Sequence, residues 1–192
     1  MSAAPVTPIV REPMSLDEFF ALDVVLAELV DGQPVILSSP NVFHQVVLTR
    51  LMRTLFVGCP PDLLVLPAPM DWVLWEMPAA TVRQPDIMVV PAWLLHAVRV
   101  TTPPVLAVEV VSDSSVERDL VAKRREYAKA GAAHYWLVHP ARRELVVLRL
   151  EGERYTEVRR VEGDGRLAVT EPFPVTLVGT ALFGDLPDGP TA

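Results

Sequence analysis

One short stretch, residues 105–111, constrains the fold more than any other part of the sequence. Every position in it is apolar except Glu109. A continuous apolar run of this length is typical of a strand that is covered on both faces, as in the centre of an α/β sheet. A buried carboxylate is costly unless it is paired or bound to a metal. Glu109 therefore needs a partner, which is either an arginine or backbone donors within the fold, or a metal ion.

The residues after this strand, 116–130, predict an amphipathic helix that ends at Gly131. Lys123 lies in the middle of its apolar face, where its ammonium would either reach outward to solvent or enter a pocket that contains carboxylates. Asp119, one turn earlier, could pair with it. Only two of the 17 basic residues are lysines, and lysine, unlike arginine, can lose its proton when desolvated. The other inward positions are Val116, Leu120, Tyr127 and Ala130.

The remaining patterns predict one α/β domain. Ser15 and Glu18 form a capping box for a short helix, and Asp31-Gly32 is a hairpin turn whose second arm contains Pro34 and so starts late or lies at an edge. Ser39 or Asn41 caps a second helix, and residues 112–115 cap the third. The expected helices span 16–22, 42–56 and 116–130, and the expected strands span 26–30, 35–37, 63–67, 71–76, 86–90, 105–111, 135–138, 145–150, 155–160 and 167–170.

The length of 192 residues fits one domain over 15–185, with a flexible arm over 1–14 and a flexible tail over 186–192. No apolar run is long enough to cross a bilayer, and the first residues do not resemble a signal peptide. The single cysteine, Cys59, excludes an internal disulfide framework. These features predict a soluble, cytoplasmic protein.

Asp86 begins the strand expected over 86–90, and by itself it could be an ordinary strand-start aspartate. Together with Glu109 and Lys123, however, Asp86 suggests a metal site. The helix after the Glu109 strand would return Lys123 over the end of that strand, and Asp86 would come from a neighbouring strand. Two carboxylates and one ammonium at a strand end could hold a divalent cation and a water molecule. Oxygen ligands favour Mg²⁺ or Mn²⁺.

An ordered set of short motifs resembles the Uma-two (Uma2) family of restriction endonucleases, in the PD-(D/E)XK superfamily. The resemblance covers about residues 15–185. The chain departs from the family's usual residues at Asp113, which stands where a proline is common, and at His139, which stands where an aspartate is common. The matching motifs are Glu28-Leu-Val-Asp-Gly32, Pro40, His44, Arg83-Gln-Pro-Asp86, Val108-Glu109-Val-Val-Ser112, Asp119-x-x-x-Lys123-x-x-x-Tyr127, Ala130-Gly131, Tyr135-Trp136-Leu-Val138 and Pro140.

The resemblance implies a restriction-endonuclease-like core, in which helices flank a central mixed β-sheet that carries additional antiparallel strands. It implies a catalytic centre of Asp86, Glu109 and Lys123, with Mg²⁺ (or Mn²⁺) held by Asp86, Glu109 and the main-chain carbonyl of Val110. The usual superfamily position for the lysine, two residues after the acid, is Val111 here, so the helix would supply Lys123 instead. We expect supporting roles for Glu28, His44, Asp119 and Tyr127, with the alternative for His44 that it is an ordinary hydrogen-bonded histidine on the face of its helix.

Two functions follow from these expectations. The first is a metal-dependent endonuclease that hydrolyses DNA, working as a homodimer because double-strand cutters of this fold often act in pairs. The alternative is a catalytically inactive domain of the same fold that binds nucleic acid or a protein partner. The net charge of -7 favours the alternative slightly, because nucleic-acid binding usually needs a basic surface. Other chemistries lack support, since the sequence has no Gly-rich phosphate loop, no nucleophile elbow and no zinc-ligand spacing.

Overall fold

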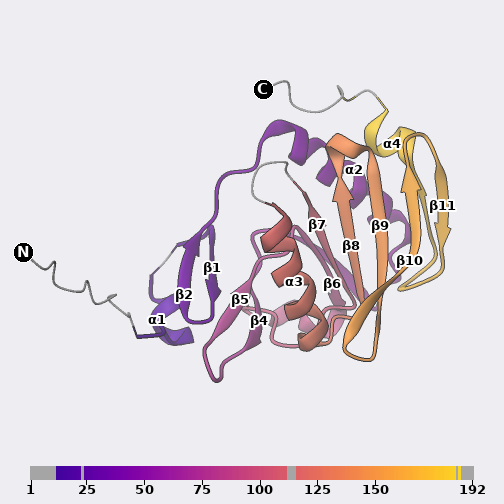
Figure 1. Cartoon of the computed structure of the whole chain (residues 1–192). Helices are drawn as coiled ribbons and strands as arrows, with labels where there is room; N and C mark the ends of the chain where they lie inside the picture. Colours follow the sequence, from indigo (N-terminus) through magenta and orange to yellow (C-terminus); the bar gives the residue numbers. More distant parts are fainter. Residues whose placement is uncertain (1–11, 23, 112–115, 185, 187–192) are drawn as a thin grey trace, which may run out of the picture.

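A six-stranded mixed sheet forms the centre of the protein (Figure 1). The structure is a computed structural model of the whole chain; it describes residues 12–22, 24–111, 116–184 and 186, with backbone only for 116–119. The strand order is β10-β9-β8-β7-β6-β3, in which β7 and β8 run parallel and the other neighbours antiparallel. The strands are β3 (Leu63–Pro67), β6 (Ile87–Pro91), β7 (Leu106–Val110), β8 (His134–His139), β9 (Glu144–Glu151) and β10 (Arg154–Glu162).

Helix α3 (Val116–Ala130) joins the parallel strands β7 and β8, because such strands need a crossover connection. It ends at Gly131, which has a φ of 88° in the left-handed region that favours glycine. Its inward face packs on one side of the sheet through a cluster of aromatic and aliphatic side chains. The cluster contains Tyr127, Ala128, Met88, Val90, Ala107, Tyr135, Val146 and Leu148. The crossover therefore returns the middle of α3 over β7.

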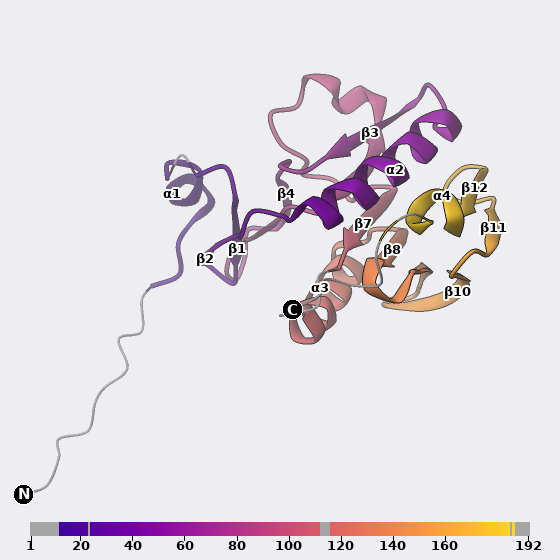
Figure 2. The same ribbon diagram turned by 90° about the horizontal axis from the view of Figure 1, so that it is seen from above.

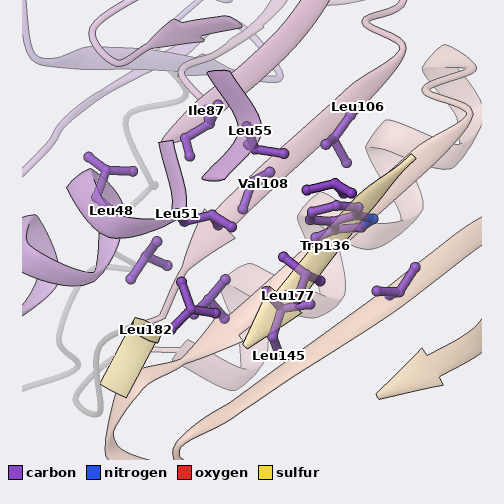
Figure 3. Packing of buried hydrophobic residues seen from close by; sticks show 14 of the residues in the cluster. Leu48, Leu51, Leu55, Ile87, Leu106, Val108, Trp136, Leu145, Leu177 and Leu182 are labelled. Atoms are coloured by element: carbon purple, nitrogen blue, oxygen red, sulfur yellow. The ribbon is translucent and has the colours of Figure 1, made fainter. Parts of the chain in front are cut away.

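Helix α2 (Val42–Gly58) covers the opposite side of β7 and β8 (Figure 2). Asn41 caps it by accepting the backbone N–H of His44 at 2.8 Å. The apolar stripe of the helix faces the sheet and meets Trp136 from β8 (Figure 3). The stripe and its partners include Leu48, Leu51, Leu55, Ile87, Leu106, Val108 and Leu177. The central strands are thus buried on both faces, as the apolar run over 105–111 predicts.

A second, antiparallel sheet lies beside the first, in the order β2-β1-β5-β4. Its core packs under helix α1 (Leu16–Phe20) through Phe19. Only residues 84–86 separate β5 from β6, so this short linker joins the two sheets and places Asp86 where they meet. The strands are β1 (Ala27–Val30), β2 (Gln33–Ile36), β4 (Trp72–Trp75) and β5 (Thr81–Arg83).

Residues 166–183 pack on the α2 side of the central sheet. Two antiparallel strands, β11 (Arg166–Val169) and β12 (Val175–Val178), lead into helix α4 (Gly179–Phe183), whose Leu182 and Phe183 are buried in the α2 cluster. Two 3-10 turns are η1 (Ala92–His96) and η2 (Pro140–Arg142). Among the described residues, no helix is long and apolar enough to cross a membrane.

The expected fold class is confirmed, and most expected elements are present. The Ser15–Glu18 capping box forms, and β2 with its Pro34 is an edge strand. Helix α2 runs two residues further than expected, to Gly58. The elements β5, β12 and α4 are absent from the predicted ones because each has only three to five residues, too few for a clear periodicity. The predicted cap at 112–115, and most of the predicted arm and tail, lie outside the described residues.

Candidate active site

Asp86 connects three elements at the junction of the two sheets. Its Oδ2 accepts the backbone N–H of Val110, at the end of β7, at 2.7 Å. The same oxygen accepts the Nε2–H of His44, in the first turn of α2, at 3.3 Å. The Asp86 side chain is about one-fifth exposed. Asp86 is therefore held by two donors and still reaches solvent.

Glu109 points from β7 to the other side of the sheet, toward α3. Its Oε1 accepts the hydroxyl of Tyr127 at 2.7 Å, and its Oε2 accepts from the ammonium of Lys123 at 3.2 Å. Tyr127 and Lys123 are four residues apart, so one face of α3 presents both donors. Among the described residues, the partners of the buried carboxylate are thus a lysine and a tyrosine, and not an arginine or backbone donors.

Lys123 lies between two carboxylates. Its Nζ is 3.2 Å from Glu109 Oε2 and 3.4 Å from Glu28 Oε1, on β1. All three side chains are buried. Of the two directions open to this lysine, the structure has the inward one, among carboxylates.

Arg83, on β5, extends the network away from Lys123. It donates to Glu28 Oε2 from Nη1 at 2.7 Å, and to both oxygens of Glu126 from Nε at 2.7 Å and Nη2 at 3.0 Å. The remaining oxygen of Glu28 accepts the backbone N–H of Gln84 at 3.1 Å. A continuous chain of ion pairs therefore runs from Glu126 to Glu109.

A cavity of about 480 Å³ opens beside these groups. Asp86, Glu109, Val110, Lys123 and His44 all line it, although Asp86 and Glu109 contact helices on opposite sides of the sheet. The other wall comes from the segment before α2 and includes residues 38–41. A substrate in this cavity would meet both carboxylates at once.

The electrostatics of the site favour an added positive charge. Burial, together with the charges of Asp86 and Glu28, raises the pKa of Glu109 to about 7, although the charge of Lys123 and the hydrogen bond from the Tyr127 hydroxyl act in the opposite direction. Burial lowers the pKa of His44, but its hydrogen bond to Asp86 and the charges of Asp86 and Glu109 outweigh this effect and raise it above the usual value. The neighbouring carboxylates thus raise the pKa of both Glu109 and His44, in addition to the effect of burial.

Comparison with known proteins shows the family of this chain. Residues 16–182 match a family model, Uma2, described as "Putative restriction endonuclease". The chain belongs to the Uma2 family. No protein among the curated sequences matches it.

The fold of this Uma2 chain is also that of a solved structure. The match is a "putative nuclease belonging to DUF820" from Anabaena variabilis ATCC 29413, with a TM-score of 0.72 and 18% identity. It covers 90% of this chain and 98% of the other. The family description indicates a nuclease, and the solved structure shows that the fold is shared.

The structure brings together most of the residues that the sequence singles out in this Uma2 chain. Asp86, Glu109, Val110, Lys123 and His44 share one cavity, and two further residues, Glu28 and Tyr127, contact Lys123 and Glu109. The Asp119 side chain lies outside the described residues. The residues that sequence reasoning left without a role are Arg83, Gln84 and Glu126.

The described residues fit a divalent cation, although they contain no group of three or more His, Cys, Asp or Glu placed to hold one. Mg²⁺ commonly uses one or two carboxylates and keeps several water ligands, so Asp86, Glu109 and the Val110 carbonyl are a suitable donor set. Charge balance supports this fit. Among the described residues, the network and Asp86 contain four carboxylates, and their cationic partners are Arg83, Lys123 and, when protonated, His44.

Proposed function

We propose that this protein is a metal-dependent endonuclease that hydrolyses DNA phosphodiester bonds in the cavity beside Asp86 and Glu109. One observation carries the proposal: both carboxylates and Val110 line one cavity, and Lys123 donates to Glu109 at its edge. The family description and the nuclease-type fold support the reaction class.

In this proposal Asp86, Glu109 and the Val110 carbonyl hold Mg²⁺ or Mn²⁺. A bound cation of this kind polarises a phosphoryl oxygen and lowers the pKa of a water ligand. His44 orients Asp86 through its ring N–H, and Tyr127 orients Glu109 through its hydroxyl.

Lys123 supplies the positive charge that the reaction needs. Its Nζ is directed toward the cavity by Glu109 and lies in a buried setting, where a charge acts more strongly than in water. There it orients the attacking water or stabilises the negative charge that develops on the phosphoryl oxygens. A phosphate bound in the cavity would also face the start of α2, a region that favours anions.

A second candidate function is binding of nucleic acid or a protein partner without cleavage. The net charge of -7 favours it, because a strongly acidic protein repels the phosphate backbone except where cations are concentrated. The two candidates differ in one measurable property, which is cleavage that depends on the metal and on Asp86.

The decisive experiment incubates the full-length protein with supercoiled plasmid, linear duplex and single-stranded DNA, with Mg²⁺, Mn²⁺ or EDTA. The matched variant is Asp86→Asn, which keeps a side-chain oxygen for the Val110 N–H and removes the charge. We expect cleavage by wild type only with metal, and none by the variant. Equal cleavage by both proteins, or none by wild type with any substrate, would reject the endonuclease proposal.

A homodimer belongs to the same proposal, because two copies of one site would be needed to cut both strands of a duplex together. Light scattering at micromolar concentration, with and without a short duplex, tests it. A monomer mass under both conditions would remove the dimer from the proposal.

A further inference from the structure

We propose that Arg83 is a positioning residue that directs Lys123 to Glu109 by neutralising Glu28, the competing carboxylate. This inference rests on the proposed function, in which Lys123 acts at the cavity. Arg83 itself does not line that cavity.

Two carboxylates, Glu28 and Glu109, compete for the ammonium of Lys123. Its Nζ is nearly as close to Glu28 Oε1, at 3.4 Å, as to Glu109 Oε2, at 3.2 Å. Glu28 is only 2% exposed, so water does little to stabilise its charge. Without another cation, Glu28 would draw Lys123 toward β1 and away from the cavity.

Arg83 weakens that competition by pairing with Glu28. Its Nη1 donates to Glu28 Oε2 at 2.7 Å, which is shorter than either contact of Lys123. The Gln84 backbone N–H donates to the other Glu28 oxygen, Oε1, at 3.1 Å. Both oxygens of Glu28 thus have donors besides Lys123, so Glu28 competes less strongly with Glu109 for the Lys123 ammonium.

The contacts of Arg83 with two carboxylates explain why this position holds an arginine. Arg83 also binds Glu126 of α3 through Nε and Nη2, at 2.7 and 3.0 Å. The planar guanidinium fork can bridge two carboxylates from β1 and α3, whereas a lysine offers a single point charge. Glu126 is one turn after Lys123, so the same contact fixes the turn of α3 that carries Lys123.

If Arg83 has this role, its loss should change the metal affinity and the cleavage rate in different ways. If Lys123 moves toward Glu28, Glu109 loses a competitor for the metal, so metal affinity should stay the same or increase. The cleavage step should nevertheless slow, because the charge that Lys123 supplies is misplaced. A merely structural role for Arg83 would instead weaken both properties together.

The experiment measures Mn²⁺ affinity by calorimetry and single-turnover plasmid cleavage at saturating Mn²⁺. The variants are Arg83→Met, Arg83→Lys and the double variant Arg83→Met with Glu28→Gln, which removes the competing charge. The control is Arg124→Met, on the same helix, whose guanidinium donates to the carbonyl of Tyr155 instead of to the network. All proteins are first compared by circular dichroism.

We expect Arg83→Met to cleave at least about tenfold more slowly without weaker Mn²⁺ binding. Arg83→Lys should lie between it and wild type, and Glu28→Gln in the double variant should restore part of the rate. Arg124→Met should resemble wild type. Unchanged cleavage in Arg83→Met, a parallel loss of Mn²⁺ affinity and rate, or no rescue by Glu28→Gln would overturn the inference.

A separate measurement tests Arg83 even if the endonuclease proposal fails. In metal-free protein, the melting temperatures of Arg83→Met, Lys123→Met and their double variant form a double-mutant cycle. Because both cations serve Glu28, we expect the two single effects to be non-additive. Additive effects would overturn the inference, whereas absence of Mn²⁺ binding by wild type would overturn only the proposed function.

Discussion

Lys123 and Glu109 are fourteen positions apart in the sequence, and the Nζ of the lysine lies 3.2 Å from the Oε2 of the glutamate. The crossover from β7 through α3 to β8 creates this contact, because it returns the helix over the strand that it follows. The pair therefore depends on the chain topology, and the lysine comes from a helix although its acid comes from a strand.

Replacing Lys123 with Met should abolish most of the proposed activity. The variant loses the charge that acts on the phosphoryl group, and we expect cleavage to fall by about 100-fold or more. Calorimetry should show Mn²⁺ binding at least as tight as in wild type, because the ammonium no longer competes for Glu109. The protein should remain folded with a lower melting temperature, since Glu28 and Glu109 lose a buried partner.

The matched control is Lys129→Met, which removes the other lysine of the chain. Lys129 lies on the same helix, with its Nζ 4.3 Å from the centre of the Trp75 ring and outside the network. It should cleave DNA at the wild-type rate. Full activity in Lys123→Met would exclude this residue from the mechanism.

His44 should affect metal binding through Asp86. The His44 ring N–H donates to Asp86 Oδ2 at 3.3 Å, and groups that orient a metal ligand typically contribute 10–100-fold to affinity. We expect about tenfold weaker Mn²⁺ binding in His44→Leu, which has no donor. His44→Gln retains an N–H donor and should keep most of the affinity. If the two variants bind equally, the hydrogen bond has no role in holding the metal.

A comparison with Tyr155 tests whether Tyr127 has a role in the site beyond that of an ordinary buried tyrosine. Each hydroxyl donates at 2.7 Å, Tyr127 to Glu109 Oε1 and Tyr155 to the carbonyl of Ala132. Substitution with Phe should destabilise the fold by about 1–3 kcal/mol in both cases, because each leaves a buried acceptor without its donor. Thermal unfolding measures this loss. Only Tyr127→Phe should change Mn²⁺ affinity or cleavage; an equal effect from Tyr155→Phe would argue that stability alone is responsible.

The sequence predicts those site residues that interrupt a local apolar pattern. Glu109 interrupts an apolar strand, and Lys123 interrupts the apolar face of a helix, so each is anomalous among its neighbours in the sequence. Their meeting follows from the βαβ crossover, which the order of these elements predicts. The position of Asp86 depends more on the family resemblance than on any pattern around it.

The Arg83 network has no such pattern. Arg83 binds Glu28 and Glu126, which are 55 and 43 positions away, and it lies on a three-residue strand that periodicity does not detect. A charged residue in a short, proline-flanked segment is typical of an exposed turn. Only the packing of the second sheet against α3 shows that this arginine is buried, so its partners could not be identified from the sequence.

Outside the site, His134 should make stability depend on pH. It is buried at the start of β8, and burial lowers its pKa below the usual 6.5; the charge of Glu171 opposes this shift and that of Arg149 adds to it. The unfolded chain therefore binds more protons than the folded chain just below pH 6.5. The stabilisation associated with neutral His134 is complete above this value and is lost as the pH falls toward the folded-state pKa.

A comparison of wild type with His134→Gln isolates this contribution, because Glu109 and His44 are present in both proteins. The melting temperature is measured for each between about pH 8 and about pH 5, in EDTA. The advantage of wild type over the variant should be constant at the upper end and should shrink as the pH falls below about 6.5, because protonation places a charge in a buried position. A difference that stays constant over the whole range would show that the pKa of His134 is the same in the folded and the unfolded chain.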